Sequence, residues 1–125
     1  MTYFPDLTEH TYTTFPRRSG VLNVGWLGRS HPFLTGDTPD SFGSALKSLC
    51  ESPILLHRGF HLCEFCEPGE QFQGNGQIRI EAQNGQVYSA PTMIYHYVSV
   101  HNYRPPEQYI EAVLNPKRIV SESSL

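Results

Sequence analysis

The sequence contains no hydrophobic run near the ~20 residues that a transmembrane helix requires. It also contains no basic stripe, because nine Lys and Arg residues are scattered among twelve Asp and Glu residues, with a net charge of −3. Without such a stripe we expect no nucleic-acid partner. The first residues, Met-Thr-Tyr-Phe-Pro-Asp, lack the basic and apolar regions of a signal peptide. These absences predict a cytoplasmic protein that binds neither membranes nor nucleic acids.

Familiar catalytic signatures are missing as well. The sequence has no Gly-x-Ser-x-Gly elbow, no phosphate-binding loop and no dinucleotide-binding fingerprint. A metal-dependent nuclease of the ββα type would need a His on the first strand of its hairpin, but residues 77–81 read Gln-Ile-Arg-Ile-Glu. The sequence therefore names no catalytic residue, and it leaves open whether the protein is an enzyme.

Apolar residues are scarce, at 38% of 125 residues, while ten Pro and ten Gly predict many turns and short elements. A chain of this length fits one domain with a modest core, and a bound metal would help to stabilise it. We predict one α+β domain over residues 1–116 and a flexible C-terminal tail over residues 117–125.

Local patterns predict a small antiparallel sheet. Residues 77–81 alternate with period two, Asn84-Gly85 is a strong hairpin turn signal, and residues 86–89 supply the partner strand. A further strand is predicted over residues 21–27, which are mostly apolar.

Two or three helices are predicted to pack on this sheet. Thr38 suits the N-cap of a helix that ends before Pro53, because Pro39 suits its first position and apolar residues recur at helical spacing. Further helices are predicted over residues 92–101 and 106–114.

The densest group of metal-ligating residues is His61-x-Cys63-x-x-Cys66, and His96 and His101 follow thirty residues after it. A Cys-x-x-Cys followed by paired His is a metal-site spacing, and zinc is its usual occupant. The order of Cys-x-x-Cys turn, β-hairpin and helix is also that of a treble-clef zinc finger. We therefore predict a Zn²⁺ cofactor and a treble-clef-like core.

Helix geometry leaves the choice of histidines open. On an ideal helix His96 and His101 point about 140° apart, so both would reach one metal only if the helix ended or loosened between them. His61 is the alternative, because on a strand it would share a face with Cys63. We expect His96 ahead of His101 and His61, with Cys63 and Cys66 as the firmest ligands.

Redox chemistry is the rival interpretation of Cys-x-x-Cys. Pro68-Gly69 follows the motif at once, so no long helix can begin at the cysteines, as one does in thioredoxin-like proteins. Glu64 and Glu67 would raise the pKa of the thiols by charge repulsion. A metal site is therefore favoured.

The C-terminal third is rich in Tyr and His. Two interpretations stay open: an amphipathic helix pair that lines the core, which is favoured, and a surface that binds a protein partner. The residues concerned are Tyr95, His96, Tyr97, His101, Tyr103 and Tyr109.

Several segments, which cover roughly residues 1–114, resemble a family of small bacterial proteins of unknown function. They include residues 23–27 (NVGWL), 31–33 (HPF), 59–66 (GFHLCEFC), 74–80 (GNGQIRI) and 90–98 (APTMIYHYV), together with His101 and Pro105-Pro106. The resemblance implies a bacterial source and one intact domain with an HxCxxC…HxxxxH pattern. It implies no activity.

The sequence thus favours a small cytosolic zinc-stabilised binding or regulatory protein. The alternative is a metal-dependent hydrolase with an open zinc site lined by His61, His96 and His101, in which three protein ligands and a water molecule would hold the metal.

Overall fold

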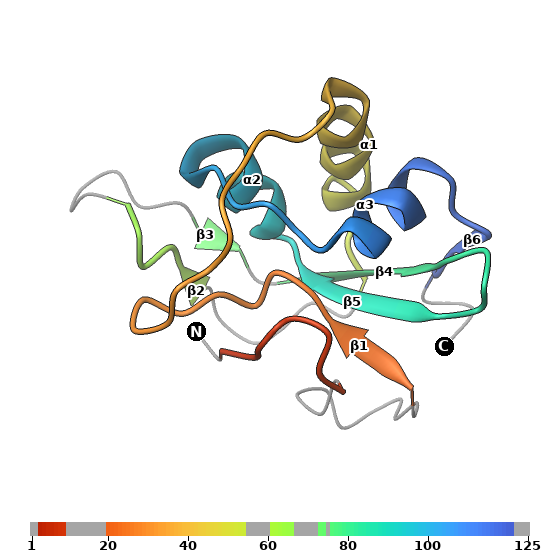
Figure 1. Cartoon of the computed structure of the whole chain (residues 1–125), viewed down its shortest axis with the longest axis horizontal. Helices are drawn as coiled ribbons and strands as arrows, with labels where there is room; N and C mark the ends of the chain where they lie inside the picture. The colour runs from red at the N-terminus through yellow and green to blue at the C-terminus, as the bar shows by residue number, and fades with distance from the viewer. Residues whose placement is uncertain (1–2, 10–19, 55–60, 67–72, 75, 122–125) are drawn as a thin grey trace.

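A four-stranded mixed sheet is the centre of the fold (Figure 1). The computed structural model describes residues 3–9, 20–54, 61–66, 73–74 and 76–121, and for residues 61, 62, 73 and 74 it describes the backbone alone. In spatial order the strands are β1 (Val21–Asn23), β5 (Val87–Pro91), β4 (Gln77–Glu81) and β6 (Arg118–Ile119). The α+β class is confirmed. The prediction of an antiparallel sheet is wrong for β1, which runs parallel to β5.

The predicted β4–β5 hairpin is confirmed. Its register pairs Ile80 with Tyr88, and the turn contains Gly85 at φ 90°. The Asn84 side chain accepts a hydrogen bond from the backbone N–H of Gln86 at 3.0 Å. These are the local properties that make Asn-Gly a hairpin turn.

The strand predicted over residues 21–27 ends early, at Asn23. Gly25 has φ 79°, a left-handed conformation that interrupts an extended chain. The Gly25 backbone also packs against Ile94, and a Cβ atom added at Gly25 would lie 2.8 Å from that side chain.

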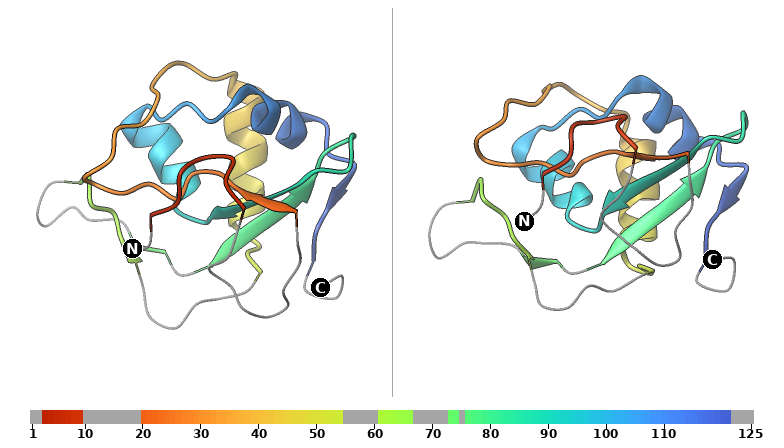
Figure 2. Two further views of the ribbon diagram at one scale, coloured as in Figure 1. Left: turned by 60° about the horizontal axis from the view of Figure 1, so that its bottom comes forward. Right: turned by 90° about the horizontal axis from the view of Figure 1, so that it is seen from below.

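The helices α1 (Asp40–Cys50), α2 (Ile94–His101) and α3 (Glu107–Leu114) lie together on one face of the sheet (Figures 1 and 2). All three predicted helices are confirmed. The prediction of Thr38 as N-cap is wrong, because Pro39 precedes the first helical residue and no side chain caps the helix. In the described part of the chain, no helix has the length and apolar character that a membrane crossing needs.

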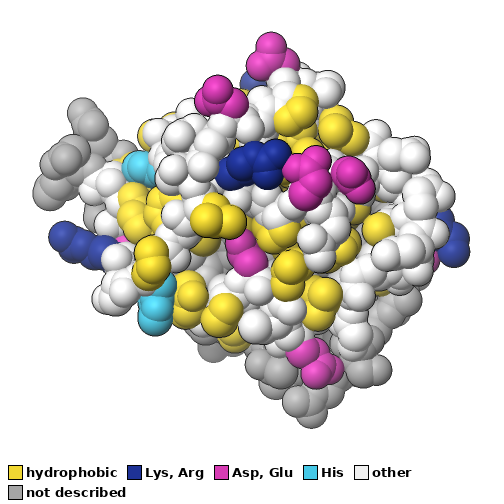
Figure 3. All heavy atoms as spheres, viewed as in Figure 1, with side chains coloured by type: hydrophobic (Ala, Val, Ile, Leu, Met, Phe, Trp, Pro, Cys, Tyr) yellow, Lys and Arg dark blue, Asp and Glu magenta, His cyan; other side chains and the backbone are white. Residues whose placement is uncertain are grey.

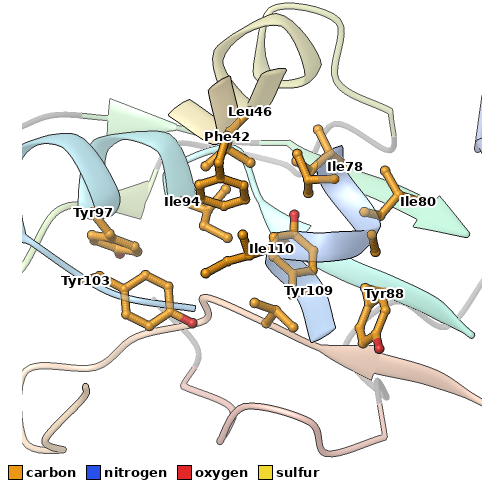
Figure 4. Packing of buried hydrophobic residues seen from close by; sticks show 14 of the residues in the cluster. Phe42, Leu46, Ile78, Ile80, Tyr88, Ile94, Tyr97, Tyr103, Tyr109 and Ile110 are labelled. Atoms are coloured by element: carbon orange, nitrogen blue, oxygen red, sulfur yellow. The ribbon is translucent and has the colours of Figure 1, made fainter. Parts of the chain in front are cut away.

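The core fills the space between the helices and the sheet (Figure 4). Aromatic rings meet edge to face there, as in the pair Tyr88 and Tyr109, whose centroids are 5.6 Å apart. Full burial of each large apolar side chain stabilises the fold by about 1.5–3 kcal/mol. The core side chains labelled in Figure 4 are Phe42, Leu46, Ile78, Ile80, Tyr88, Ile94, Tyr97, Tyr103, Tyr109 and Ile110.

The folded part of the chain extends past residue 116, where the sequence predicts its end. Residues 118 and 119 form β6 and pair with β4. Val120 is buried in a small apolar cluster with Val21, Ile54 and Val87. Residues 118–120 thus pack on the rest of the domain, residues 122–125 lie outside the described residues, and the flexibility of the tail stays a prediction.

Candidate metal centre

Two short elements carry the predicted ligands. Cys63 and Cys66 follow the strand β2 (His61–Leu62), which pairs antiparallel with β3 (Gln73–Gly74). His96 and His101 lie in the first and last turns of α2. Cys63 is fully buried and His96 is nearly so, whereas Cys66 and His101 are half-buried.

The side chains of Cys63, Cys66, His96 and His101 converge, and they could hold a metal ion. The four ligand atoms, two Sγ and two ring nitrogens, all lie within 4.8 Å of one another. The Cys66 Sγ atom is 3.1 Å from His96 Nε2 and 3.5 Å from His101 Nε2. The Cys63 Sγ atom is 3.4 Å from His101 Nε2, and the two Nε2 atoms are 3.2 Å apart.

Ordinary hydrogen bonding does not account for this cluster. A neutral imidazole nitrogen has either one hydrogen or one lone pair in the ring plane. The Nε2 atom of His101 nevertheless faces three partners, namely both sulfur atoms and His96 Nε2. The atoms surround a common point instead of forming separate pairs, as ligands of one ion do.

The spacing also has the size of a tetrahedral metal centre. With metal–nitrogen bonds of about 2.0–2.1 Å and metal–sulfur bonds of about 2.3 Å, tetrahedral angles place nitrogens about 3.3 Å apart and nitrogen and sulfur about 3.6 Å apart. The observed nitrogen–nitrogen distance is 3.2 Å, and three of the four nitrogen–sulfur distances are 3.1, 3.4 and 3.5 Å. The four side chains therefore fit a metal without a change of fold.

The expectation that helix geometry separates His96 from His101 is wrong. Their rings lean toward the same side of α2, with centroids 4.9 Å apart and planes at 76°. An imidazole carries Nε2 well away from the backbone, so two residues on diverging faces can still meet beyond the helix surface. His101 is also the last residue of α2, and Asn102 follows in the left-handed conformation at φ 59°. The side chain of His61 lies outside the described residues, so its ligand role stays a prediction.

The surroundings of the cluster favour uncharged ligands. Burial raises the pKa of the Cys63 thiol, and it lowers the pKa of His96, which the neighbouring His101 lowers further. Neutral imidazole is the form that binds metals, and a divalent cation in the cluster would deprotonate the thiols. Tyr97 lies nearby, and its pKa is raised by burial and by the adjacent Cys63. Its hydroxyl therefore stays protonated.

The two residues between the cysteines attach the turn to the rest of the fold. The Phe65 ring lies 5.8 Å from the Tyr97 ring, 5.7 Å from the His101 ring and 5.2 Å from the Phe33 ring. The Glu64 carboxylate accepts a hydrogen bond from the backbone N–H of Arg29 at 3.0 Å. The sequence reasoning missed these contacts, because no local pattern connects residues 64 and 65 with partners about thirty residues away.

The structure also bears on the Tyr-rich C-terminal third. Tyr97, Tyr103 and Tyr109 are all exposed by 1% or less and lie in the core, and Tyr95 is half-buried. This burial agrees with the interpretation that these helices line the core. A protein partner of this region stays a prediction.

Hollows in the surface lie apart from the cluster. One of about 490 Å³ lies between the β4–β5 turn and α3, and another of about 390 Å³ lies between α1, α3 and β6. Neither is lined by a residue of the Cys/His cluster. No catalytic role is shown for the cluster.

Comparisons with known proteins identify the family to which the chain belongs. Searches of curated proteins and of solved structures gave no match to the chain. Residues 2–114 match the family described as Domain of unknown function (DUF7919), which covers most of the 125 residues. The chain that carries this Cys/His cluster therefore belongs to that uncharacterised family.

Proposed function

We propose that Cys63, Cys66, His96 and His101 hold a structural zinc ion and that the protein is a small zinc-stabilised binding or regulatory protein. The convergence of two thiols and two imidazoles within 4.8 Å carries this proposal. A mixed thiolate and imidazole set in a tetrahedral arrangement suits Zn²⁺, whereas Mg²⁺ and Ca²⁺ prefer oxygen ligands. The zinc would tie the Cys-x-x-Cys turn to α2.

The order of elements supports a treble-clef-like centre. The Cys-x-x-Cys turn follows β2, then come β3 and the β4–β5 hairpin, and α2 would supply the remaining ligands. His101 departs from that arrangement, because it lies at the end of the helix and not near its start. We therefore propose a relative of the treble-clef design with a wider ligand spacing.

A structural role is favoured over the alternative of a metal-dependent hydrolase. An open catalytic zinc site keeps one place for water beside three protein ligands. Here four side chains each offer a ligand atom within 4.8 Å of the others, enough for a tetrahedral set, so with all four bound one would have to leave before water could bind. Such a closed site stabilises the fold instead of supplying a reactive hydroxide.

The site also favours ligation over disulfide chemistry. A reactive Cys-x-x-Cys normally lies at the N-terminus of a helix, where its thiolate is stabilised and accessible. Cys63 instead follows a strand and is fully buried. We place the protein in the cytoplasm, where reducing conditions keep both cysteines available as ligands.

The nature of the binding partner belongs to the same proposal. On the face shown in Figure 3, acidic and basic side chains are interspersed instead of being sorted by sign. Nucleic-acid binding usually needs a clustered basic surface. A protein partner therefore suits this face better than a nucleic acid.

Elemental analysis and chelation test the zinc proposal. We expect about one zinc per purified chain, and chelation should lower the melting temperature by more than about 10 °C, because structural zinc contributes several kcal/mol to folding. Cys63→Ser should lose the zinc. The matched control is Cys50→Ser, which changes the cysteine of α1 and should keep it. Metal-free protein whose melting is unchanged by chelator would overturn the proposal.

A further inference from the structure

The segment of residues 28–36, which leads from β1 toward α1, rests on the metal-binding turn. The backbone N–H of Arg29 donates to Glu64 at 3.0 Å, and the Phe33 ring packs edge to face on Phe65 at 5.2 Å. Glu64 and Phe65 are the two residues between the cysteines. In Figure 1 the orange chain runs from β1 out to the region of β2 and then turns up past α2 toward α1.

The same segment is held on its other side by residues that directly follow His101. The backbone N–H of Gly36 donates to the carbonyl of Asn102 at 3.1 Å, and that of Arg104 donates to the carbonyl of Leu34 at 2.9 Å. The Phe33 ring also meets the Tyr103 ring edge to face, at 5.8 Å. The segment is thus clamped between the two parts of the chain that supply the ligands.

The N-terminal residues 3–9 rest in turn on this region. The Tyr3 and His31 rings stack with centroids 3.7 Å apart and planes at 6°. The Asp6 carboxylate accepts hydrogen bonds from the Tyr103 hydroxyl at 2.7 Å and from the backbone N–H of Gly25 at 2.9 Å. Displacement of residues 28–36 would therefore break the stack of Tyr3 on His31, whereas Asp6 is held by residues outside that segment.

We propose that metal occupancy sets the position of residues 28–36, a segment that contains no metal ligand. This inference rests on the proposed function. Without the metal, the turn loses its tie to both histidines of α2 and keeps the two-residue pairing of β2 with β3 and the packing of Cys63 and Phe65 on the core. We expect Glu64 and Phe65 then to shift and release Arg29 and Phe33. The segment carries Leu34, which is 76% exposed and the most exposed large hydrophobic side chain in the described part of the chain.

Amide hydrogen exchange, measured by NMR with and without zinc, tests the coupling. On chelation we expect the amides of Arg29, Gly36 and Arg104 to exchange at least about tenfold faster, because each takes part in holding the segment. The amides of the β4–β5 hairpin serve as an internal control and should change less than about twofold. Unchanged exchange at all three positions, in protein that has lost its zinc, would overturn the coupling.

Phe65→Ala provides a second arm in protein that keeps its zinc. Phe65 is not a ligand, so the variant should bind one zinc. The amides that hold residues 28–36 should nevertheless exchange as fast in this variant as in the chelated wild type. Tyr95→Ala is the matched control, since it removes a half-buried ring from α2 itself and reports general loosening of that helix. If Phe65→Ala leaves the segment protected, or if Tyr95→Ala releases it equally, the coupling is wrong.

The two proposals fail in different ways. A chain that binds no metal overturns both the zinc site and the coupling. A chain that binds one zinc, but whose residues 28–36 are insensitive to zinc removal and to Phe65→Ala, overturns only the coupling. If chelation unfolds the hairpin as well, the zinc-loaded Phe65→Ala protein alone decides.

Discussion

His101 ends α2, and its Nε2 atom meets two sulfur atoms and one nitrogen within 3.5 Å. The His96 Nε2 atom lies closer to a sulfur atom, at 3.1 Å from Cys66 Sγ, and His101 is the more exposed of the two histidines. Because His101 is the last residue of α2, only one side of it is held by helical structure.

Replacing His101 distinguishes the proposed ligand set of Cys63, Cys66, His96 and His101 from one that includes His61. We expect His101→Ala to weaken zinc binding by more than about 100-fold, since even an outer partner of a metal ligand usually contributes 10–100-fold. Competition with a chromophoric chelator measures this affinity. His61→Ala is the matched control and should bind zinc as the wild type does. The opposite result, with His61→Ala the weaker binder, would show that His61 supplies the fourth ligand.

At the scale of elements, the turn that ends β1 depends on Gly25. Its φ of 79° is costly for a residue with a side chain, and an added Cβ would lie 2.8 Å from Ile94, near the start of α2. The turn that follows β1 is therefore in direct contact with the first residue of α2, the helix that carries His96 and His101.

Two glycine substitutions should have opposite effects. Gly25→Ala should destabilise the fold by about 2–4 kcal/mol, from backbone strain together with a steric clash against a packed side chain. Gly43→Ala, in the interior of α1 with open space around it, should stabilise the fold by about 0.5–1 kcal/mol. Urea denaturation at constant pH measures both. Equal effects of the two substitutions would contradict the role assigned to the Gly25 turn.

The elements that could be predicted are those that short sequence patterns within the element determine. The β4–β5 hairpin follows from Asn84-Gly85 between alternating residues, and the three helices follow from apolar spacing between prolines. The parallel pairing of β1 with β5 and the pairing of β6 with β4 were not predictable, because their partners are far apart in sequence and no short pattern joins them.

The same distinction applies to the candidate site. The spacing of Cys63 and Cys66 and the type of residue at His96 predict candidate ligands from sequence alone. The approach of His101 to the other three side chains depends on the orientation of its ring at the end of α2. Helical periodicity does not predict that orientation. The contacts of Glu64 and Phe65 with Arg29 and Phe33 appear only once the chain has folded.

At the scale of the whole molecule, Asp6 fastens the N-terminal residues to a partner 97 positions away, Tyr103. Burial raises the pKa of Asp6 from its ordinary value of 3.8, and the hydrogen bonds from Tyr103 and Gly25 offset only part of that shift. The folded state therefore binds the Asp6 proton more tightly than the unfolded state does. The contribution of Asp6 to stability is full below pH 3.8 and is lost as the pH rises through its folded-state pKa.

Asp6→Asn removes this titration and keeps the hydrogen-bonding capacity of the side chain. An Asn carbonyl can accept from Gly25, and its amide can donate to the Tyr103 hydroxyl. We expect the variant to gain stability relative to wild type as the pH rises from about 4 to about 7. Unfolding in urea at pH 4, 5.5 and 7 measures the difference. A difference that is constant across this range would contradict the assignment of the raised pKa to Asp6.

The parallel pairing of β1 with β5 has a consequence for how the protein is made. β1 and α1 are synthesised first, but β1 pairs with β5, and α1 packs against α2 and α3, all of which begin after residue 86. Such distant pairings close large loops and form slowly. The apolar surfaces of the first half of the chain therefore stay exposed until the second half emerges from the ribosome. Folding of this domain is a late event in its synthesis, and the nascent chain is exposed to aggregation until then.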